Sequence, residues 1–142
     1  MFSKPNLIST LLTSIWAYFG GYLLWDVIGG PLLQNHKGSA QYVEKSQPDM
    51  VLMVLACIIT GFAFSTIYGK WARGKHGALH GLKYGLLISL FGISYALISF
   101  SMTNLMELTG AIYDAALSVV YYLIMGALAG MAYNAFQKPA TH

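Results

Sequence analysis

The stretch MVLMVLACIITGFAFSTIYG, residues 50–69, decides the fold class of this chain. It contains no Asp, Glu, Lys or Arg, and three other uncharged stretches of similar length cover residues 5–25, 84–106 and 115–137. At about 1.5 Å of rise per residue, roughly 20 residues of α-helix cross a hydrocarbon core of about 30 Å. Each stretch is therefore long enough to span a bilayer.

Charged residues lie almost wholly between these stretches. Only 9% of the 142 residues are charged, whereas about 25% are charged in an average soluble domain. A charge at the centre of a bilayer costs at least about 2.5 kcal/mol, so a membrane requires this segregation. We predict an all-α, four-helix transmembrane bundle that forms a single domain over residues 1–142, with spans at about residues 6–28, 49–70, 82–104 and 111–136.

The basic residues indicate how the four spans are oriented. With an even number of spans, both termini and the connection between the second and third spans lie on one side. That side carries most of the basic residues: Lys4, Lys70, Arg73, Lys75, Lys83 and Lys138. Short-loop Lys and Arg residues mark the cytoplasmic face. We therefore expect both termini to be cytoplasmic, in a bacterial-type cytoplasmic (inner) membrane.

The connection at residues 70–83 concentrates the positive charge of the chain. We expect it to face anionic lipid, since each basic residue near such a surface contributes about 1 kcal/mol of attraction; the charge pattern does not indicate nucleic-acid binding. His76 and His80 have the spacing of two metal ligands on one helix face, but no nearby Cys, Asp or Glu completes a tetrahedral site. We interpret both as interfacial histidines and assign neither a metal nor a cofactor.

Small residues recur at every fourth position in the third span: Gly77, Gly81, Gly85 and Ser89. Helices in membranes associate through close van der Waals contact, which small residues permit. Shorter ridges in the second and fourth spans contain Gly61, Gly126 and Gly130. We predict that Gly81 and Gly85 contact a neighbouring helix. The ridges indicate either a compact bundle or self-association along the third span.

The second and fourth spans also resemble each other. A shift of 65 residues aligns Asp49 with Asp114, Gly61 with Gly126, and Tyr68 with Tyr133. A two-helix unit repeated once would give parallel repeats, as in some transporters. Chance similarity between two apolar helices is the alternative interpretation.

Carboxylates gather on the side opposite the basic residues, at the ends of spans. Carboxylates that lie close together raise one another's pKa values and can hold a proton or a cation. With nearby polar residues of the third and fourth spans, they form a candidate outward-facing binding pocket: Asp26, Tyr95, Asn104, Glu107, Asp114 and Tyr121. The alternative is that these carboxylates are structural, with Asp114 complementing the positive amino-terminal end of its helix.

Three functional hypotheses remain open. The first is a non-catalytic subunit or assembly factor of a larger membrane complex, which the small size favours. The second is a homo-oligomeric transporter of a small solute, an ion or protons, with the acidic pocket at its mouth. The third is an intramembrane enzyme that acts on lipid or quinone; the separation of the carboxylates from His76 and His80 argues against hydrolase chemistry. The expected partners are the lipid bilayer and either another membrane protein or further copies of the chain.

Overall fold

The computed structural model describes residues 2–40 and 47–136, so Glu44, Lys45 and Lys138 lie outside the described residues. Within this part of the chain, four helices are long and apolar enough to cross a membrane: Lys4–Ile28, Met50–Trp71, Ala78–Met102 and Leu108–Asn134. The predicted all-α, four-helix transmembrane bundle is confirmed. The orientation in the membrane and the tandem repeat stay predictions.

The first span changes its winding near its end. Helix α1, Lys4–Gly21, begins with proline in its first turn, where the missing amide hydrogen is not needed. It continues as a π-helical segment, η1, Tyr22–Ile28, which ends with the amide of Gly29 donating to the carbonyl of Leu24 at 2.8 Å. The short helix α2, Gly30–Gln34, follows directly. A π-helical turn inside a span re-aims the side chains that it carries, and such turns are frequent at functional sites.

The other three spans are regular α-helices. Helix α3, Met50–Trp71, is capped by Asp49, whose carboxylate accepts the amides of Val51 and Leu52 at 3.1 Å. Helix α4, Ala78–Met102, follows a tight connection in which Gly74 and Gly77 have positive φ angles of 81° and 139°. These angles favour glycine, because other residues are strained there. Helix α5, Leu108–Asn134, completes the bundle.

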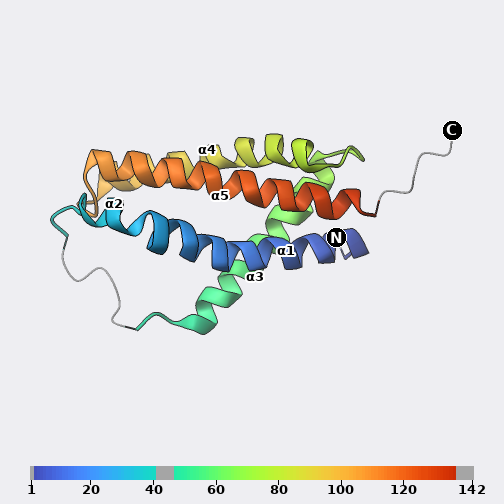
Figure 1. Cartoon of the computed structure of the whole chain (residues 1–142), viewed down its shortest axis with the longest axis horizontal. Helices are drawn as coiled ribbons and strands as arrows, with labels where there is room; N and C mark the ends of the chain where they lie inside the picture. Colours follow the sequence, from blue (N-terminus) through green and yellow to red (C-terminus); the bar gives the residue numbers. More distant parts are fainter. Residues whose placement is uncertain (1, 41–46, 137–142) are drawn as a thin grey trace.

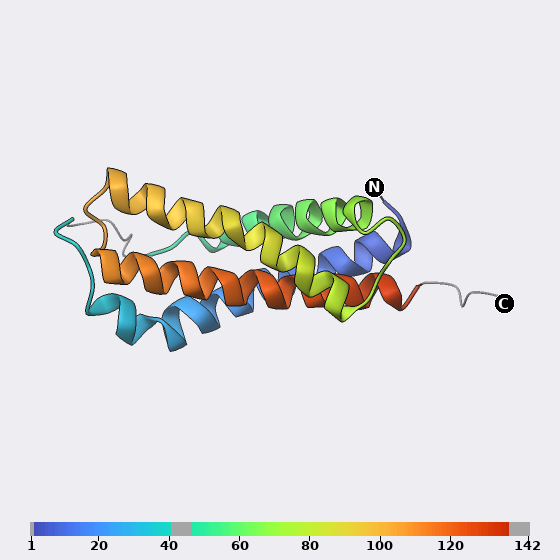
Figure 2. The same cartoon turned by 90° about the horizontal axis from the view of Figure 1, so that it is seen from above.

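The helices form two packed pairs (Figures 1 and 2). Helices α4 and α5 lie side by side, and α1 packs against both α5 and α3. The amino-terminal end of α1, the carboxy-terminal end of α5 and the α3–α4 connection lie at one end, which we call the basic end because it carries Lys4, Lys70, Arg73 and Lys75. We call the opposite end, with α2 and the α4–α5 connection, the acidic end.

The α4–α5 contact is a seam of glycines. A Cβ atom added to Gly81 would collide with the carbonyl oxygen of Gly126, and one added to Gly85 would collide with that of Tyr122. A Cβ atom added to Gly130 would likewise collide with the carbonyl oxygen of Gly77. The two backbones therefore approach within a distance that only hydrogen at Cα permits. The ridge glycines of α4 face α5 within the chain, and Ser89 is buried with its hydroxyl donating to the carbonyl of Leu86.

The α1–α3 contact is held mainly by polar side chains. The Ser9 hydroxyl donates to the Ser65 hydroxyl at 2.8 Å, and the Thr13 hydroxyl lies 3.1 Å from the same Ser65 oxygen. All three side chains are fully buried. Gly61 completes the contact, since a Cβ there would collide with the Ser14 side chain. This contact is confined to the half of α3 nearest the basic end.

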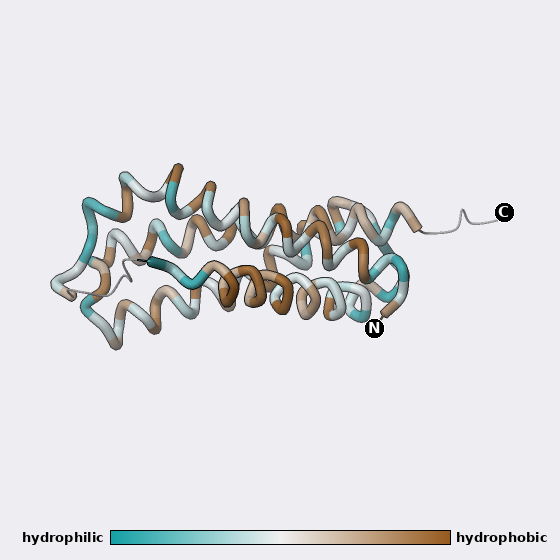
Figure 3. The backbone as a smooth tube through the Cα atoms, turned by 90° about the horizontal axis from the view of Figure 1, so that it is seen from below, coloured by the Kyte–Doolittle hydropathy of each residue, from teal (hydrophilic) through white to brown (hydrophobic). Residues whose placement is uncertain are grey.

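The other half of α3 leaves the bundle. In Figure 1 it crosses α1 and points away from the remaining helices, and Figure 3 shows it brown along its turns. From Met50 to Thr60 every residue is exposed except the half-buried Cys57. Burial begins at Gly61, where α3 meets α1. The most hydrophobic helix of the protein therefore spends half of its length without a partner among the described residues.

Residues paired by the 65-residue shift have different surroundings in the structure. Asp49 caps α3, whereas Asp114 lies within α5 and accepts a hydrogen bond from Trp25. Gly61 packs against α1, whereas Gly126 packs against α4. Tyr68 and Tyr133 do meet at the basic end, with ring centroids 5.4 Å apart.

Candidate functional site

A pocket of about 540 Å³ opens at the acidic end of the bundle, between η1, α4 and α5. Its size lies within the range of about 300–1,000 Å³ that is typical of small-molecule sites. One carboxylate, one hydroxyl-bearing serine, one glycine and five aromatic side chains line it: Trp25, Phe91, Gly92, Tyr95, Asp114, Ser118, Tyr121 and Tyr122. We call it the acidic-end pocket.

Asp114 and Trp25 form the polar centre of this pocket. The Trp25 indole nitrogen donates to Asp114 Oδ1 at 2.6 Å. Trp25 lies in the π-helical segment of the first span, and Asp114 lies in the second turn of α5. Because the donor is neutral, this hydrogen bond satisfies one carboxylate oxygen without cancelling its negative charge.

Tyr121 forms a fixed wall of the pocket. Its hydroxyl donates to the carbonyl of Ala17 at 3.5 Å, and its own carbonyl accepts the indole N–H of Trp16 at 3.0 Å. Its ring meets Trp25 edge to face, with centroids 5.5 Å apart, and Tyr122 in the same manner at 5.1 Å. Contacts to α1 on both its backbone and its side chain therefore hold Tyr121 in place.

The predicted pocket residues divide between several places. Asp114, Tyr95 and Tyr121 line the acidic-end pocket together. Asp26 lines a separate groove, described below. Glu107 lies 3.3 Å from the His36 ring and is exposed. Asn104 is exposed, and its backbone carbonyl accepts the amide of Ala40.

A second, larger hollow lies between α1 and the diverging half of α3. This α1–α3 groove has a volume of about 710 Å³. Small residues, Ala17, Gly21 and Cys57, form part of its lining, and Met50 and Met53 line it from α3. Asp26 and Trp25 lie at its acidic end. Trp25 therefore borders both hollows, with Asp114 on one side and Asp26 on the other.

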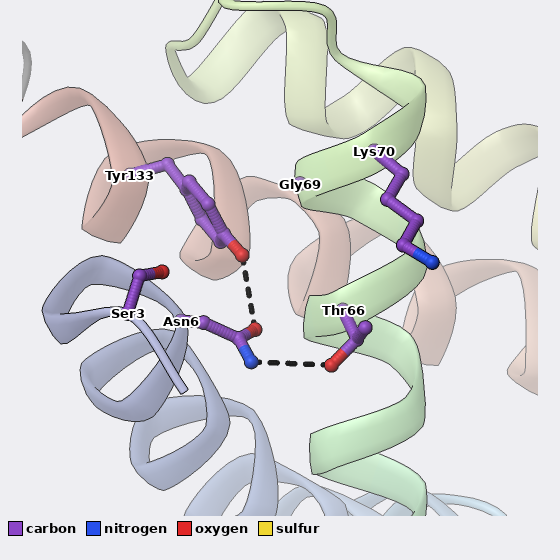
Figure 4. Close-up of a pocket in the computed structure, with 6 residues that line it drawn as sticks. All are labelled: Ser3, Asn6, Thr66, Gly69, Lys70 and Tyr133. Atoms are coloured by element: carbon purple, nitrogen blue, oxygen red, sulfur yellow. Dashed lines mark hydrogen bonds between the residues drawn. The ribbon is translucent and has the colours of Figure 1, made fainter. Parts of the chain in front are cut away.

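A small polar pocket of about 170 Å³ lies near the basic end (Figure 4). Asn6 is almost fully buried there; its amide donates to the Thr66 hydroxyl at 3.1 Å, and its oxygen accepts the Tyr133 hydroxyl at 2.9 Å. Figure 4 shows this chain of bonds joining α1, α3 and α5, with Ser3, Gly69 and Lys70 around it. Asn6 is not among the site residues that the sequence pattern predicts. The available signal was that Asn6, Ser9 and Thr13 share one face of α1 by helical spacing.

The two histidines of the α3–α4 region pack among aromatic rings. His76 lies 5.0 Å from the Tyr133 ring, and His80 lies 4.6 Å from the Trp71 ring. One ring nitrogen of each is buried without a hydrogen-bond partner among the described residues. Burial, and then the neighbouring His80, lower the pKa of His76. In the described part of the chain, no three His, Cys, Asp or Glu side chains come together as a metal site.

Comparison with known proteins gives no relative: no protein-family model, curated protein or solved structure matches the chain. The four apolar helices fit a small multi-pass membrane protein.

Proposed function

We propose that the chain is a small non-catalytic subunit or assembly factor of a larger membrane complex. A transmembrane helix of a partner protein fills the α1–α3 groove. The observation that carries the proposal is the acidic-end half of α3, which has no helix against it among the described residues. Val51 is 77% exposed and Ile59 is 60% exposed, on the same helix that buries Tyr68 completely.

The lining of the groove suits a helix better than lipid chains. Ala17 and Gly21 lie four residues apart on α1, and Met50, Met53 and Cys57 follow at helical spacing on α3. Aromatic residues of α1 and η1 also line the groove: Tyr18, Phe19, Tyr22 and Trp25. Small side chains let another helix backbone approach closely. Methionine adapts its shape to irregular surfaces. The groove therefore has small residues that a partner helix can approach closely and methionines that can adapt to its surface.

Gly21 distinguishes this groove from the rest of the bundle. A Cβ atom added to Gly21 would meet nothing within 4 Å, whereas one added to Gly81, Gly85 or Gly126 would meet the backbone of a packed helix. Each of the other glycines in the described spans is used inside the chain, because an added Cβ there would lie within 4 Å of another residue. Gly21 has no such use among the described residues, so it is available to a helix from outside.

Crosslinking tests this proposal. A photoreactive residue at Met53 should form an adduct of one discrete mass with a different membrane protein in native membranes, and Gly21→Leu should abolish that adduct. The same residue at Leu90, exposed on α4, is the matched control and should give no discrete adduct. Equal yields from Met53 and Leu90, or an adduct that survives Gly21→Leu, would contradict the proposal.

The second candidate is a homo-oligomeric transporter of a small solute or an ion. One observation favours it: Asp114 lies in a pocket of ligand size with Tyr95 and Tyr121. Asp26 and Glu107, however, do not line that pocket. In the crosslinking experiment, an adduct of twice the mass of the 15.5 kDa chain would favour this candidate over a heterologous partner.

We propose that both termini are cytoplasmic in a bacterial-type inner membrane, with the basic end against anionic lipid. The support is the gathering of Lys4, Lys70, Arg73 and Lys75 at one end of the bundle. A cysteine at Ala135 should react with an impermeant reagent only after permeabilisation, whereas one at Ser39 should react in intact cells; both positions are exposed. The reverse pattern would invert the orientation.

A further inference from the structure

The acidic-end pocket has the composition of a site for a positively charged organic molecule. We propose that it binds a small alkyl- or aralkylammonium ion of single positive charge between Asp114 and the surrounding aromatic rings. This site is separate from the α1–α3 groove apart from their shared wall at Trp25, and the inference does not depend on the partner helix proposed above.

The charge of the lining is the first argument. Asp114 is the one carboxylate, and the described residues that line the pocket include no Lys, Arg or His. The hydrogen bond from Trp25 orients the carboxylate but leaves its charge in place. A partly buried charge without a counter-ion is costly. A bound cation would supply that counter-ion.

The aromatic rings are the second argument. Cations are attracted to the faces of Trp, Tyr and Phe rings, and sets of such rings bind quaternary ammonium groups. Five aromatic side chains line this pocket. The rings of Trp25 and Tyr122 stand at 75° and 80° to the ring of Tyr121. Rings at such angles can surround a rounded ammonium group on more than one side.

The oxygen content of the pocket argues against a bare metal ion. Calcium takes about 6–8 oxygen ligands, and magnesium keeps a strict octahedral shell. The lining offers the Asp114 carboxylate, the buried Ser118 hydroxyl and tyrosine hydroxyls, of which that of Tyr121 is directed to α1. An alkylammonium ion requires fewer oxygens, because its apolar surface packs against the rings. One carboxylate then balances its charge.

Calorimetry on the chain in lipid nanodiscs tests the site, with benzyltrimethylammonium as the probe and protein-free nanodiscs as background. Asp114→Asn keeps an oxygen that can accept from Trp25 but removes the charge, so we expect affinity to fall by about tenfold or more. Asp26→Asn, in the adjacent groove, is the matched control and should change affinity by less than about twofold. Potassium ions should not displace the probe.

Further variants keep the test decisive. Tyr95 is 72% exposed, so Tyr95→Leu should leave folding intact while lowering affinity several-fold. Asp114→Glu restores the charge and should restore binding relative to Asp114→Asn. The proposal is overturned by an absence of saturable binding to the wild type, or by equal affinities of the wild type and Asp114→Asn. It also fails if Asp26→Asn weakens binding as strongly, or if the uncharged analogue neopentylbenzene displaces the probe with equal affinity.

Discussion

The α4–α5 pair and the α1–α3 pair pack in opposite ways. In the first pair, Gly81, Gly85 and Gly126 bring two backbones into direct contact. In the second pair, Ser9, Thr13 and Ser65 hydrogen-bond at the basic end, and beyond Gly61 the helices separate. Small residues in a span therefore do not indicate by themselves whether a helix is packed. What decides is whether a backbone lies opposite them.

The largest effect on stability should come from placing a large side chain in the glycine seam between α4 and α5. In Gly85→Leu, the new side chain would collide with the backbone of Tyr122 and Leu123, which cannot move without separating α4 from α5. We expect a loss of about 3 kcal/mol in the free energy of unfolding, at the upper end for overpacking. Unfolding in mild detergent measures it. Wild-type stability in this variant would show that the seam does not hold the pair together.

A smaller effect should appear where the two pairs join. His76 lies in the α3–α4 connection against Tyr68, Tyr133 and His80. Because burial lowers its pKa in the folded state, folding favours the neutral ring. Its contribution to stability is therefore complete above the unfolded-state pKa of about 6.5 and is lost as the pH falls below that value toward the lower folded-state pKa.

The measurement for His76 is the thermal unfolding midpoint between pH 8 and pH 5. We expect the midpoint to fall across this interval in the wild type, and to fall less in His76→Phe, which keeps a ring against Tyr133. Titrating groups distant from His76 contribute equally to both proteins, so the difference reports His76 together with its coupling to His80. Identical pH profiles for the two proteins would show that the charge of His76 does not affect stability.

The smallest effect on stability should follow Gly21→Leu in the open groove. Nothing in the described structure lies within 4 Å of the added Cβ, so the free energy of unfolding should change by less than about 0.5 kcal/mol. Gly85→Leu makes the same substitution in the closely packed α4–α5 pair. The two variants together therefore test directly whether the two helix pairs differ in packing. Similar losses in the two variants would remove the distinction between a closed and an open pair.

The sequence predicts the fold well because a bilayer imposes a strict rule on charge. Uncharged stretches of the required length have few alternatives to a transmembrane helix. It predicts part of the acidic-end pocket for a related reason: Asp114, Tyr95 and Tyr121 are polar residues in apolar spans, and they do lie around one hollow. Asp26, in contrast, lines the α1–α3 groove. Its direction depends on the π-helical winding of Tyr22–Ile28, which no motif in the sequence signals.

Two other features could not be predicted from the sequence, for physical reasons. Helix α3 is apolar on all its faces, so its periodicity could not show that half of it has no partner. Asn6 lies close to Lys4 in the first turn of α1, where a polar residue is common, yet tertiary packing buries it against Thr66 and Tyr133. In both cases the outcome depends on the crossing of α1 and α3, which is set by side chains distant in the sequence.

The number of residues in the π-helical segment determines the directions in which the side chains of the first span point. A π-helical turn contains about one residue more than an α-helical turn, so deleting one residue within 26–28 and restoring α-helical winding would leave the residues beyond the segment in nearly the same orientation. Gly29 would then keep its place against Leu117, whereas Trp25, which lies before the deletion, would turn away from Asp114. Substitutions in this segment alter one side chain each, whereas a change of length would uncouple the two hollows that Trp25 separates.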